Sequence, residues 1–257
     1  MQVTEKRYEV STLDLLKTAA VAMMIADHVG LYLYQDPWLR IVGRGAAIIF
    51  GFLIGISGST RVPPSWVVLG IGLTLLQGRL YPDTDTGHAL DILISLALTR
   101  NLMPYFERLH GDNPLLLVPA AVLMALIAQP VNIYLEYGPE VVLLALLGLA
   151  MRLDNGQHGA RSARNGVALV ALVGMNVIAL LHFGFQGLQI AGCVAVISAT
   201  VLILTAYRRA PVAVPGILAP VVRFTGRNTL WIYAVHLVIF MVLGQGDSSA
   251  DPGDEED

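Results

Sequence analysis

The sequence predicts an all-α, polytopic membrane protein built as a bundle of transmembrane helices. Of its 257 residues, 55% are hydrophobic and only 14% are charged, and the mean hydropathy is +0.65. A soluble protein of this length would carry about a quarter charged residues. Apolar runs of membrane-spanning length recur along the whole chain. These observations predict one integral membrane domain, residues 1–246, and an acidic disordered tail, residues 247–257.

About nine spans are expected, and Pro, Gly or Asp residues separate most of them. The Val-Pro-Pro stretch at 62–64 follows the second span, and Gly-Asp-Asn-Pro at 111–114 follows the fourth. The third to the sixth spans are short for a bilayer crossing. No long polar insert and no internal repeat interrupts the series. In chain order the expected spans are 13–34, 41–59, 65–80, 88–104, 114–130, 138–152, 166–183, 187–207 and 228–245.

Positive charges predict the orientation, because cytoplasmic loops carry the excess of Lys and Arg. With the N-terminus inside, most basic residues fall in cytoplasmic segments, and only Arg40, Arg44 and Arg79 remain outside. We therefore expect a multi-pass protein of the cell (inner) membrane, embedded in its lipid bilayer. The single cysteine, Cys193, lies in an apolar span, which excludes a disulfide framework and a Cys-based metal site. Nothing indicates nucleic-acid binding or a bound metal.

The first span contains the most informative polar residues, the pair Asp27-His28. Ionisable side chains inside a membrane span are costly and indicate a functional site. Lys17 precedes the histidine by eleven residues, which is close to three helical turns. Lys17 and His28 should therefore share a helix face, with roughly 16 Å between them along the axis. This geometry joins a cation near one membrane surface to a histidine deep in the protein.

Arg40 and Arg44 lie where the chain re-enters the membrane on the outer side, at about the depth of Asp27. One interpretation is interfacial snorkelling by two arginines. The other is functional: one arginine pairs with Asp27, while the other faces substrate or stabilises a developing negative charge.

Three further residues lie near the outer ends of later spans. Asp91 opens the fourth span, where an acid either complements the helix dipole or faces a substrate. Glu136 and Tyr137 precede the sixth span. They are either ordinary loop residues or part of the outer mouth of a site.

The last span carries His236 near the middle of the bilayer, and Thr229, Tyr233 and His236 share one stripe at helical spacing. A buried histidine often serves only as a hydrogen-bonding core residue. The histidines of the first and last spans would nevertheless meet if the bundle closes on itself.

At these residues the chain resembles the TraX family of membrane proteins. The segments LDLLKTAAVAMMIADHVG at 13–30 and PWLRIVGRGAAIIFGFLIG at 37–55 are similar to the opening of that family. LEYG at 135–138 and GRNTLWIYAVHL at 226–237 are similar to its later blocks. The resemblance runs in order over nearly the whole chain, although its middle is mainly hydrophobicity.

TraX proteins are associated with N-terminal acetylation of pilin. They also resemble the wider transmembrane acyltransferases, including the acyltransferase-three family and the heparan-glucosaminide acetyltransferases. In the acyltransferase-three family a basic residue precedes a membrane histidine by eleven positions, as Lys17 precedes His28. The resemblance implies acyl transfer from cytoplasmic acyl-CoA to an acceptor on the outer side. Departures are Lys17 in place of the more usual arginine and Asp91 in place of asparagine.

The working hypothesis is an acyl-CoA-dependent transmembrane O- or N-acetyltransferase. Its co-substrate is acetyl-CoA or another acyl-CoA, and its acceptor is left open as a glycan, a lipid headgroup or a peptide amine. The histidine of the first span acts as general base, and its neighbouring aspartate orients it or tunes its charge. Candidate catalytic residues are His28, Asp27, Arg40, Arg44, His236 and Tyr233. Candidate cofactor-binding residues are Lys17, Arg223, Arg227 and Asn228, and candidate substrate-binding residues are Asp91, Glu136 and Tyr137.

Two alternatives use the same residues. In a proton-coupled transporter, Asp27-His28 serves as the proton site. In a non-catalytic membrane assembly factor, the buried charges only pair with one another.

Overall fold

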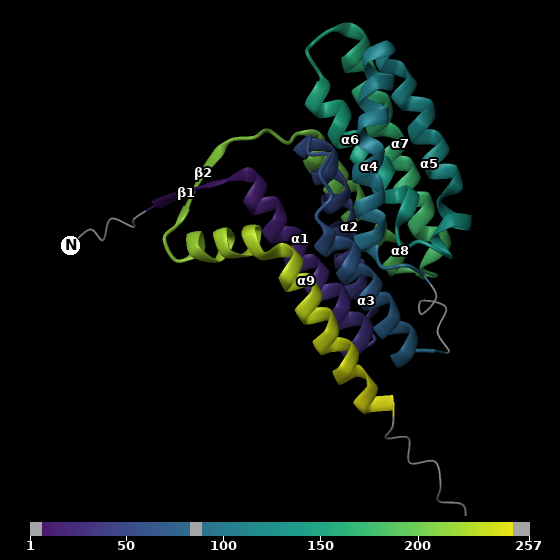
Figure 1. Cartoon of the computed structure of the whole chain (residues 1–257), viewed down its shortest axis with the longest axis vertical. Coiled ribbons are helices and arrows are strands. Elements are labelled where there is room, and N and C mark those ends of the chain that lie inside the picture. The colour runs from purple at the N-terminus through teal and green to yellow at the C-terminus, as the bar shows by residue number, and fades with distance from the viewer. Residues whose placement is uncertain (1–6, 83–88, 249–257) are drawn as a thin grey trace, which may run out of the picture.

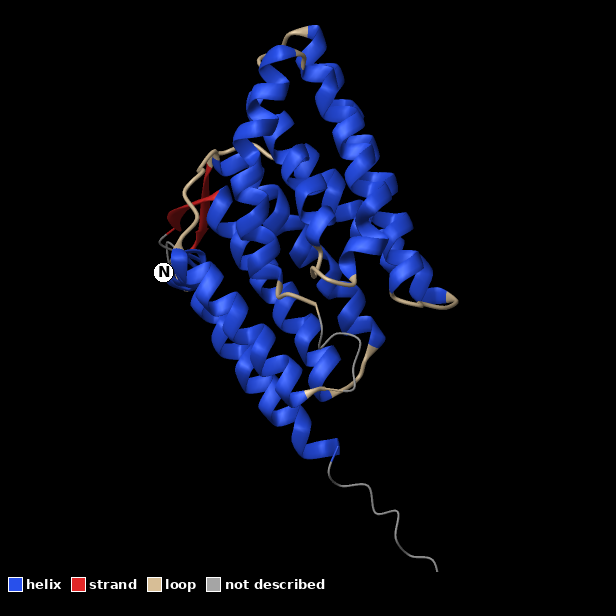
Figure 2. Ribbon diagram, turned by 45° about the vertical axis from the view of Figure 1, so that its right-hand side comes forward, coloured by secondary structure: helices blue, strands red, loops and turns tan. Residues whose placement is uncertain are grey.

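The fold is a bundle of helices with one small sheet at its side (Figures 1 and 2). The computed structural model describes residues 7–82 and 89–248, so the end of the expected acidic tail, 249–257, lies outside the described residues. In chain order the elements are β1 (Arg7–Ser11), α1 (Thr12–His28), the π-helix η1 (Val29–Leu33), α2 (Pro37–Ser57), α3 (Pro64–Leu80), α4 (Ile92–Asp112), the 3₁₀ turn η3 (Pro114–Leu116), α5 (Leu117–Asn132), α6 (Gly138–Leu153), α7 (His158–His182), α8 (Leu188–Thr205), β2 (Pro211–Pro215) and α9 (Leu218–Ser248).

The predicted all-α polytopic class is confirmed. Within the described part of the chain, six helical segments are long and apolar enough to cross a membrane. They are Thr12–Leu33, Pro37–Ser57, Pro114–Asn132, His158–His182, Leu188–Thr205 and Leu218–Gln245. Helices α3 and α6 match two of the expected short spans to within a residue, whereas α4 begins at Ile92 and ends at Asp112, eight residues beyond the expected fourth span, 88–104. The count of nine crossings and the cytoplasmic N-terminus stay predictions.

Helix α6 forms the centre of the bundle. It has only 16 residues, but its run from Gly138 to Ala150 is buried throughout, because it is apolar on every face except at Glu140. Helix α2 packs directly against it through small residues. A Cβ on Gly55 would lie 1.9 Å from the carbonyl oxygen of Ala145, and one on Gly148 would lie 2.2 Å from that of Phe52. These glycines let the two backbones approach closely.

The two ends of the helical chain are joined by a feature that hydropathy did not predict. Strands β1 and β2 pair antiparallel, with Arg7 opposite Pro215 and Ser11 opposite Pro211. The strands have five residues each. β1 precedes the first apolar run and β2 lies between the last two, so no span pattern marks them. The pairing holds the start of α1 beside the start of α9, and the two helices then run side by side (Figure 1).

Helix α9 is bent. Asn228 has non-helical backbone angles, φ −109° and ψ 17°, inside the helix. Figure 1 shows that the part of α9 before this bend points away from the longer part after it, which runs alongside α1. The bend separates Arg223 from the part of α9 that packs on α1, and this separation matters for the site.

Candidate functional site

A central cavity of about 350 Å³ lies among α1, α2, α4 and α9. Lys17 and His28 both line it, as their shared helix face predicts. The cavity therefore extends for roughly three turns, about 16 Å, along α1. Its walls between these two residues are mostly apolar, with Met24, Leu96 and Leu230 among them. Other predicted residues on its wall are Asp27, Glu136, Tyr137, Arg227 and Tyr233.

The two membrane histidines meet at one end of this cavity. Nδ1 of His28 lies 2.7 Å from Nε2 of His236, and the rings stack with centroids 4.9 Å apart. Nδ1 of His236 lies 2.5 Å from the carbonyl oxygen of Ile232. A carbonyl only accepts, so this nitrogen carries the proton, and the other ring nitrogen of His236 accepts from His28. In the neutral pair, Nε2 of His28 therefore keeps its lone pair.

The backbone around His28 is unusual. Helix α1 ends at His28 and continues as the π-helix η1, a wider turn that occurs often at functional sites. Gly30 in this turn lies close to α2, because a Cβ there would be 2.7 Å from Cβ of Leu39 and 2.8 Å from the Asp36 carbonyl oxygen. Tyr32 then packs its ring 6.0 Å from that of His28. The wide turn thus packs against the start of α2 through Gly30 and places Tyr32 beside the imidazole.

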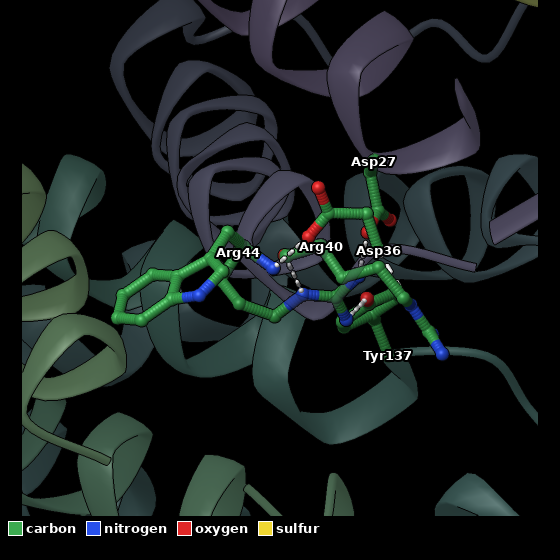
Figure 3. Close-up of polar contacts among 6 residues, drawn as sticks. Asp27, Asp36, Arg40, Arg44 and Tyr137 are labelled. Atoms are coloured by element: carbon green, nitrogen blue, oxygen red, sulfur yellow. Dashed lines mark hydrogen bonds and ion pairs between the residues drawn. The ribbon is translucent and has the colours of Figure 1, made fainter. Parts of the chain in front are cut away.

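Asp27 directs its carboxylate toward Arg40 and Arg44 of α2 (Figure 3). Its carboxylate accepts from the guanidinium of Arg44, and Nε of Arg40 lies 3.8 Å away. Gly43 permits this approach, since a Cβ there would lie 2.2 Å from Cβ of Asp27. Asp27 was predicted to orient His28 or to tune its charge. The imidazole makes its side-chain contact with His236 instead, and the charge-tuning role stays a prediction. Consecutive helical residues diverge by about 100°, which is why the two side chains separate.

Arg44 is the arginine that pairs fully with Asp27. It is 4% exposed, it donates to the Tyr137 hydroxyl, and its Nε donates to the Arg40 carbonyl oxygen at 2.9 Å. Its guanidinium also lies 4.1 Å from the centre of the Phe183 ring. A buried guanidinium needs such partners to offset its desolvation. Neither arginine is among the residues that line the central cavity, so their predicted contact with the reacting group is indirect here.

Asp91 and Tyr233 form a second buried pair beside the cavity. Asp91 caps α4, because its Oδ1 accepts from the Leu93 amide at 2.8 Å. Its Oδ2 accepts from the Tyr233 hydroxyl at 2.5 Å. Asp91 thus interacts with the N-terminus of α4, as one of its two predicted roles requires. The same carboxyl also holds Tyr233 in the wall of the cavity.

Glu136 lies in the turn between α5 and α6 and contributes its side chain to the cavity wall. Its Oε2 accepts from the Ile92 amide at 3.3 Å, and its carbonyl oxygen accepts from Ser95 Oγ at 2.6 Å. Burial, together with the neighbouring Asp91 carboxyl, raises the pKa of Glu136 to about 8. Glu136 is therefore mainly protonated at neutral pH.

The opposite end of the cavity is basic. Nζ of Lys17 donates to the Gly226 carbonyl oxygen at 3.2 Å, just before the bend of α9, and Arg227 lies on the wall. Arg100 from α4 also lines this end, although it is not among the residues predicted from the sequence. Its guanidinium lies 4.5 Å from the centre of the Trp66 ring. Its charge at the predicted cytoplasmic end of the fourth span was the only available signal.

Two predicted cofactor-binding residues lie elsewhere. Arg223 donates to the Glu9 carbonyl oxygen at 2.9 Å, before the bend of α9. Asn228 donates to the Phe224 carbonyl oxygen at 2.9 Å and so caps the broken turn. Neither is among the residues that line the cavity. The bend, which hydropathy does not reveal, turns both side chains away from Lys17.

Comparisons with known proteins agree with the family resemblance. The model of the TraX protein family matches residues 12–244. An uncharacterized protein of Rickettsia prowazekii (strain Madrid E) is 30% identical over 139 residues, which are 52% of this chain and 54% of that protein. Protein TraX of Escherichia coli is 25% identical over 235 residues, 90% of this chain and 86% of its own length. No solved structure matches.

Proposed function

The chain belongs to the TraX family of membrane proteins, and on that premise we propose that it is a membrane-embedded acyltransferase. It transfers an acetyl or other acyl group from cytoplasmic acyl-CoA to a hydroxyl or amine on the outer side. The observation that carries this proposal is the central cavity, which has Lys17, Arg100 and Arg227 at one end and His28 at the other. The wider relation to the acyltransferase-three family belongs to the same proposal.

The shape of the cavity suits the donor. The phosphates of acetyl-CoA are too polar to enter the bilayer core, while the pantetheine arm is long and thin. Lys17, Arg100 and Arg227 come from three different helices and supply the positive charge that a diphosphate requires. The mostly apolar wall above them then accommodates the arm, and about 16 Å separates this basic end from His28.

His28 has the features of a general base. Nε2 of His28 removes the proton from the acceptor hydroxyl or amine as that atom attacks the thioester carbonyl carbon. The carbon–sulfur bond then breaks, and the protonated imidazole returns the proton to the leaving thiolate. His236 holds the imidazole in the required tautomer through the 2.7 Å contact.

Tyr137 is the best-placed donor for the oxyanion that forms during attack. Arg44 donates to the Tyr137 phenol oxygen, which leaves the phenol proton available. A cation bonded to the oxygen also makes that proton a stronger donor. Arg44 thus acts through Tyr137, which itself lines the cavity. The ion pair with Asp27 holds Arg44 in place.

The proposal is tested by acetyl-CoA turnover in the purified protein in detergent. Three forms are compared: wild type, His28→Gln, and His158→Gln, whose side chain is exposed at the start of α7. Loss of a general base lowers the rate by about 10²- to 10⁴-fold. We expect that loss for His28→Gln and none for the control. No turnover in folded wild type, or full turnover in folded His28→Gln, would contradict the proposal. Proton movement without turnover would favour a transporter.

A further inference from the structure

A second cavity of about 460 Å³ lies where α2 begins, next to the connection between α7 and α8. Arg40, Gln35 and Gln189 contribute its polar wall, and Phe183 and Phe185 contribute its aromatic wall. The two phenylalanine rings stack with their centroids 5.8 Å apart. Among the described residues that line this cavity, Arg40 is the only charged one.

The surroundings of Arg40 leave a positive charge unbalanced. The Asp27 carboxylate is already paired with the buried Arg44, and Arg40 approaches it only to 3.8 Å. Nε of Arg40 is buried and has no hydrogen-bond partner among the described residues. The nearby Asp36 carboxylate caps α2 by accepting from the Trp38 amide at 2.7 Å, and it is not among the residues that line the second cavity. Two guanidinium groups thus share one carboxylate.

The two cavities are adjacent at the contact between Asp27 and Arg40. Asp27 lines the central cavity, and Arg40, which contacts Asp27, lines the second one. On η1 and the end of α1, His28 faces the central cavity while Gly30, two residues later, faces the second. A molecule bound to Arg40 would therefore lie next to Asp27, the residue that directly precedes the proposed base in the wall of the central cavity.

We propose that the second cavity is the acceptor subsite, and that it selects an acceptor carrying a phosphate or carboxylate next to its reactive amine or hydroxyl. The guanidinium of Arg40 binds the anionic group, and the reactive group points toward His28. Arginine suits this role because its fork of donors matches the oxygens of phosphate and carboxylate. This inference rests on the proposed function and adds the substrate class to it. The anionic group comes from a soluble compound or from a lipid headgroup.

The test compares acceptors that differ only in the anion. Acetyl transfer from acetyl-CoA is measured to phosphoethanolamine and to ethanolamine, with wild type, Arg40→Gln, Arg40→Lys and the control Arg79→Gln, which alters an exposed arginine at the end of α3. Loss of one charged hydrogen bond corresponds to a change of about tenfold in affinity. We expect Arg40→Gln to raise KM for phosphoethanolamine about tenfold, with ethanolamine unchanged. Arg40→Lys should retain part of the preference, and Arg79→Gln all of it.

The source of the anion is resolved in proteoliposomes. Vesicles that contain phosphatidylethanolamine are compared with vesicles of phosphatidylcholine alone supplied with phosphoethanolamine. Acetylation of the lipid assigns the subsite to a headgroup, and acetylation of the free compound assigns it to a soluble acceptor. Acetylation of neither overturns the inference, as does a preference for phosphoethanolamine that Arg40→Gln leaves intact.

Failure of the inference differs from failure of the proposed function. Hydrolysis of acetyl-CoA in the absence of any acceptor measures only the part of the proposed reaction that involves the donor. If wild type lacks that hydrolysis, the proposed function fails, and the subsite is tested by calorimetric binding of phosphoethanolamine in the absence of acetyl-CoA. Binding that Arg40→Gln abolishes and Arg40→Lys retains supports the subsite; no binding to folded wild type overturns it.

Discussion

The imidazole of His28 donates from Nδ1 to Nε2 of His236 at 2.7 Å, and this contact joins the first helix of the chain to the last. The partners are 208 residues apart in sequence. The β1–β2 pairing and the packing of α1 on α9 bring them together. The contact leaves Nε2 of His28 as the free basic atom at the end of the central cavity.

His236 is therefore expected to act as a positioning residue for His28. Phenylalanine at this position removes the acceptor, while glutamine keeps one. Loss of a group that orients a functional histidine costs about 10- to 100-fold. We expect His236→Phe to lower kcat by that amount with KM for acetyl-CoA unchanged, and His236→Gln to recover part of the loss. Equal activity of the two variants, measured by steady-state kinetics, would remove this role.

The Asp27–Arg44 ion pair is expected to contribute strongly to stability. Asp27→Asn leaves a buried guanidinium without its counter-charge, and breaking a buried pair in this way costs about 3–5 kcal/mol. Glu107→Gln is the matched control, because both side chains of the Glu107–Arg152 pair are partly exposed, at 34% and 27%. Such partly exposed pairs contribute about 0–1 kcal/mol. Thermal unfolding in detergent measures both. A similar small effect of the two substitutions would contradict the structural account of Arg44.

Arg100 is expected to bind the donor. Arg100→Gln should raise KM for acetyl-CoA about tenfold and leave kcat nearly unchanged, since its role is in binding. Arg108→Gln, an exposed position on the same helix, serves as the control. Truncated donors provide a second check: the effect of Arg100→Gln should vanish with acetyl-pantetheine, which lacks the nucleotide phosphates. An undiminished effect with that donor would assign Arg100 to another role.

Glu136 is expected to make stability depend on pH. Its pKa is raised from 4.5 to about 8 in the folded protein, so between these values the folded state binds more protons than the unfolded state. Its contribution is thus fully present below pH 4.5 and is lost as the pH rises to about 8. Relative to Glu136→Gln, wild type should lose stability over this window, as thermal unfolding at several pH values will show. Parallel curves for the two proteins would contradict the raised pKa.

Much of the fold follows from hydropathy, because lipid imposes one length and one apolar pattern on every span. The expected spans coincide with the helices to within a few residues at α3, α6 and α8. The eleven-residue spacing also placed Lys17 and His28 on one cavity wall, since helical geometry alone determines that face. The strands β1 and β2 carry no such pattern and were not predicted.

The site was predictable only where a single helix determines it. The pairing of Asp27 with Arg44 depends on Gly43 and on the packing of α2 against α1. Residue spacing in the sequence does not distinguish Arg40 from Arg44 as the partner. The contribution of Arg100 depends on how α4 meets α9 across the cavity. The bend at Asn228 moves Arg223 away from the site, and a local backbone break of this kind has no hydropathy signal.

The central claim is that an acyl group passes from a donor on the Lys17 side to an acceptor on the opposite side by way of His28. It is tested most directly in proteoliposomes, with labelled acetyl-CoA outside and phosphoethanolamine enclosed in the lumen. The account predicts labelled N-acetyl product in the lumen for wild type and for His158→Gln, and about 10²- to 10⁴-fold less for His28→Gln. Equal product in His28→Gln would contradict it, as would an absence of luminal product in wild type that binds acetyl-CoA when both phosphoethanolamine and ethanolamine are enclosed.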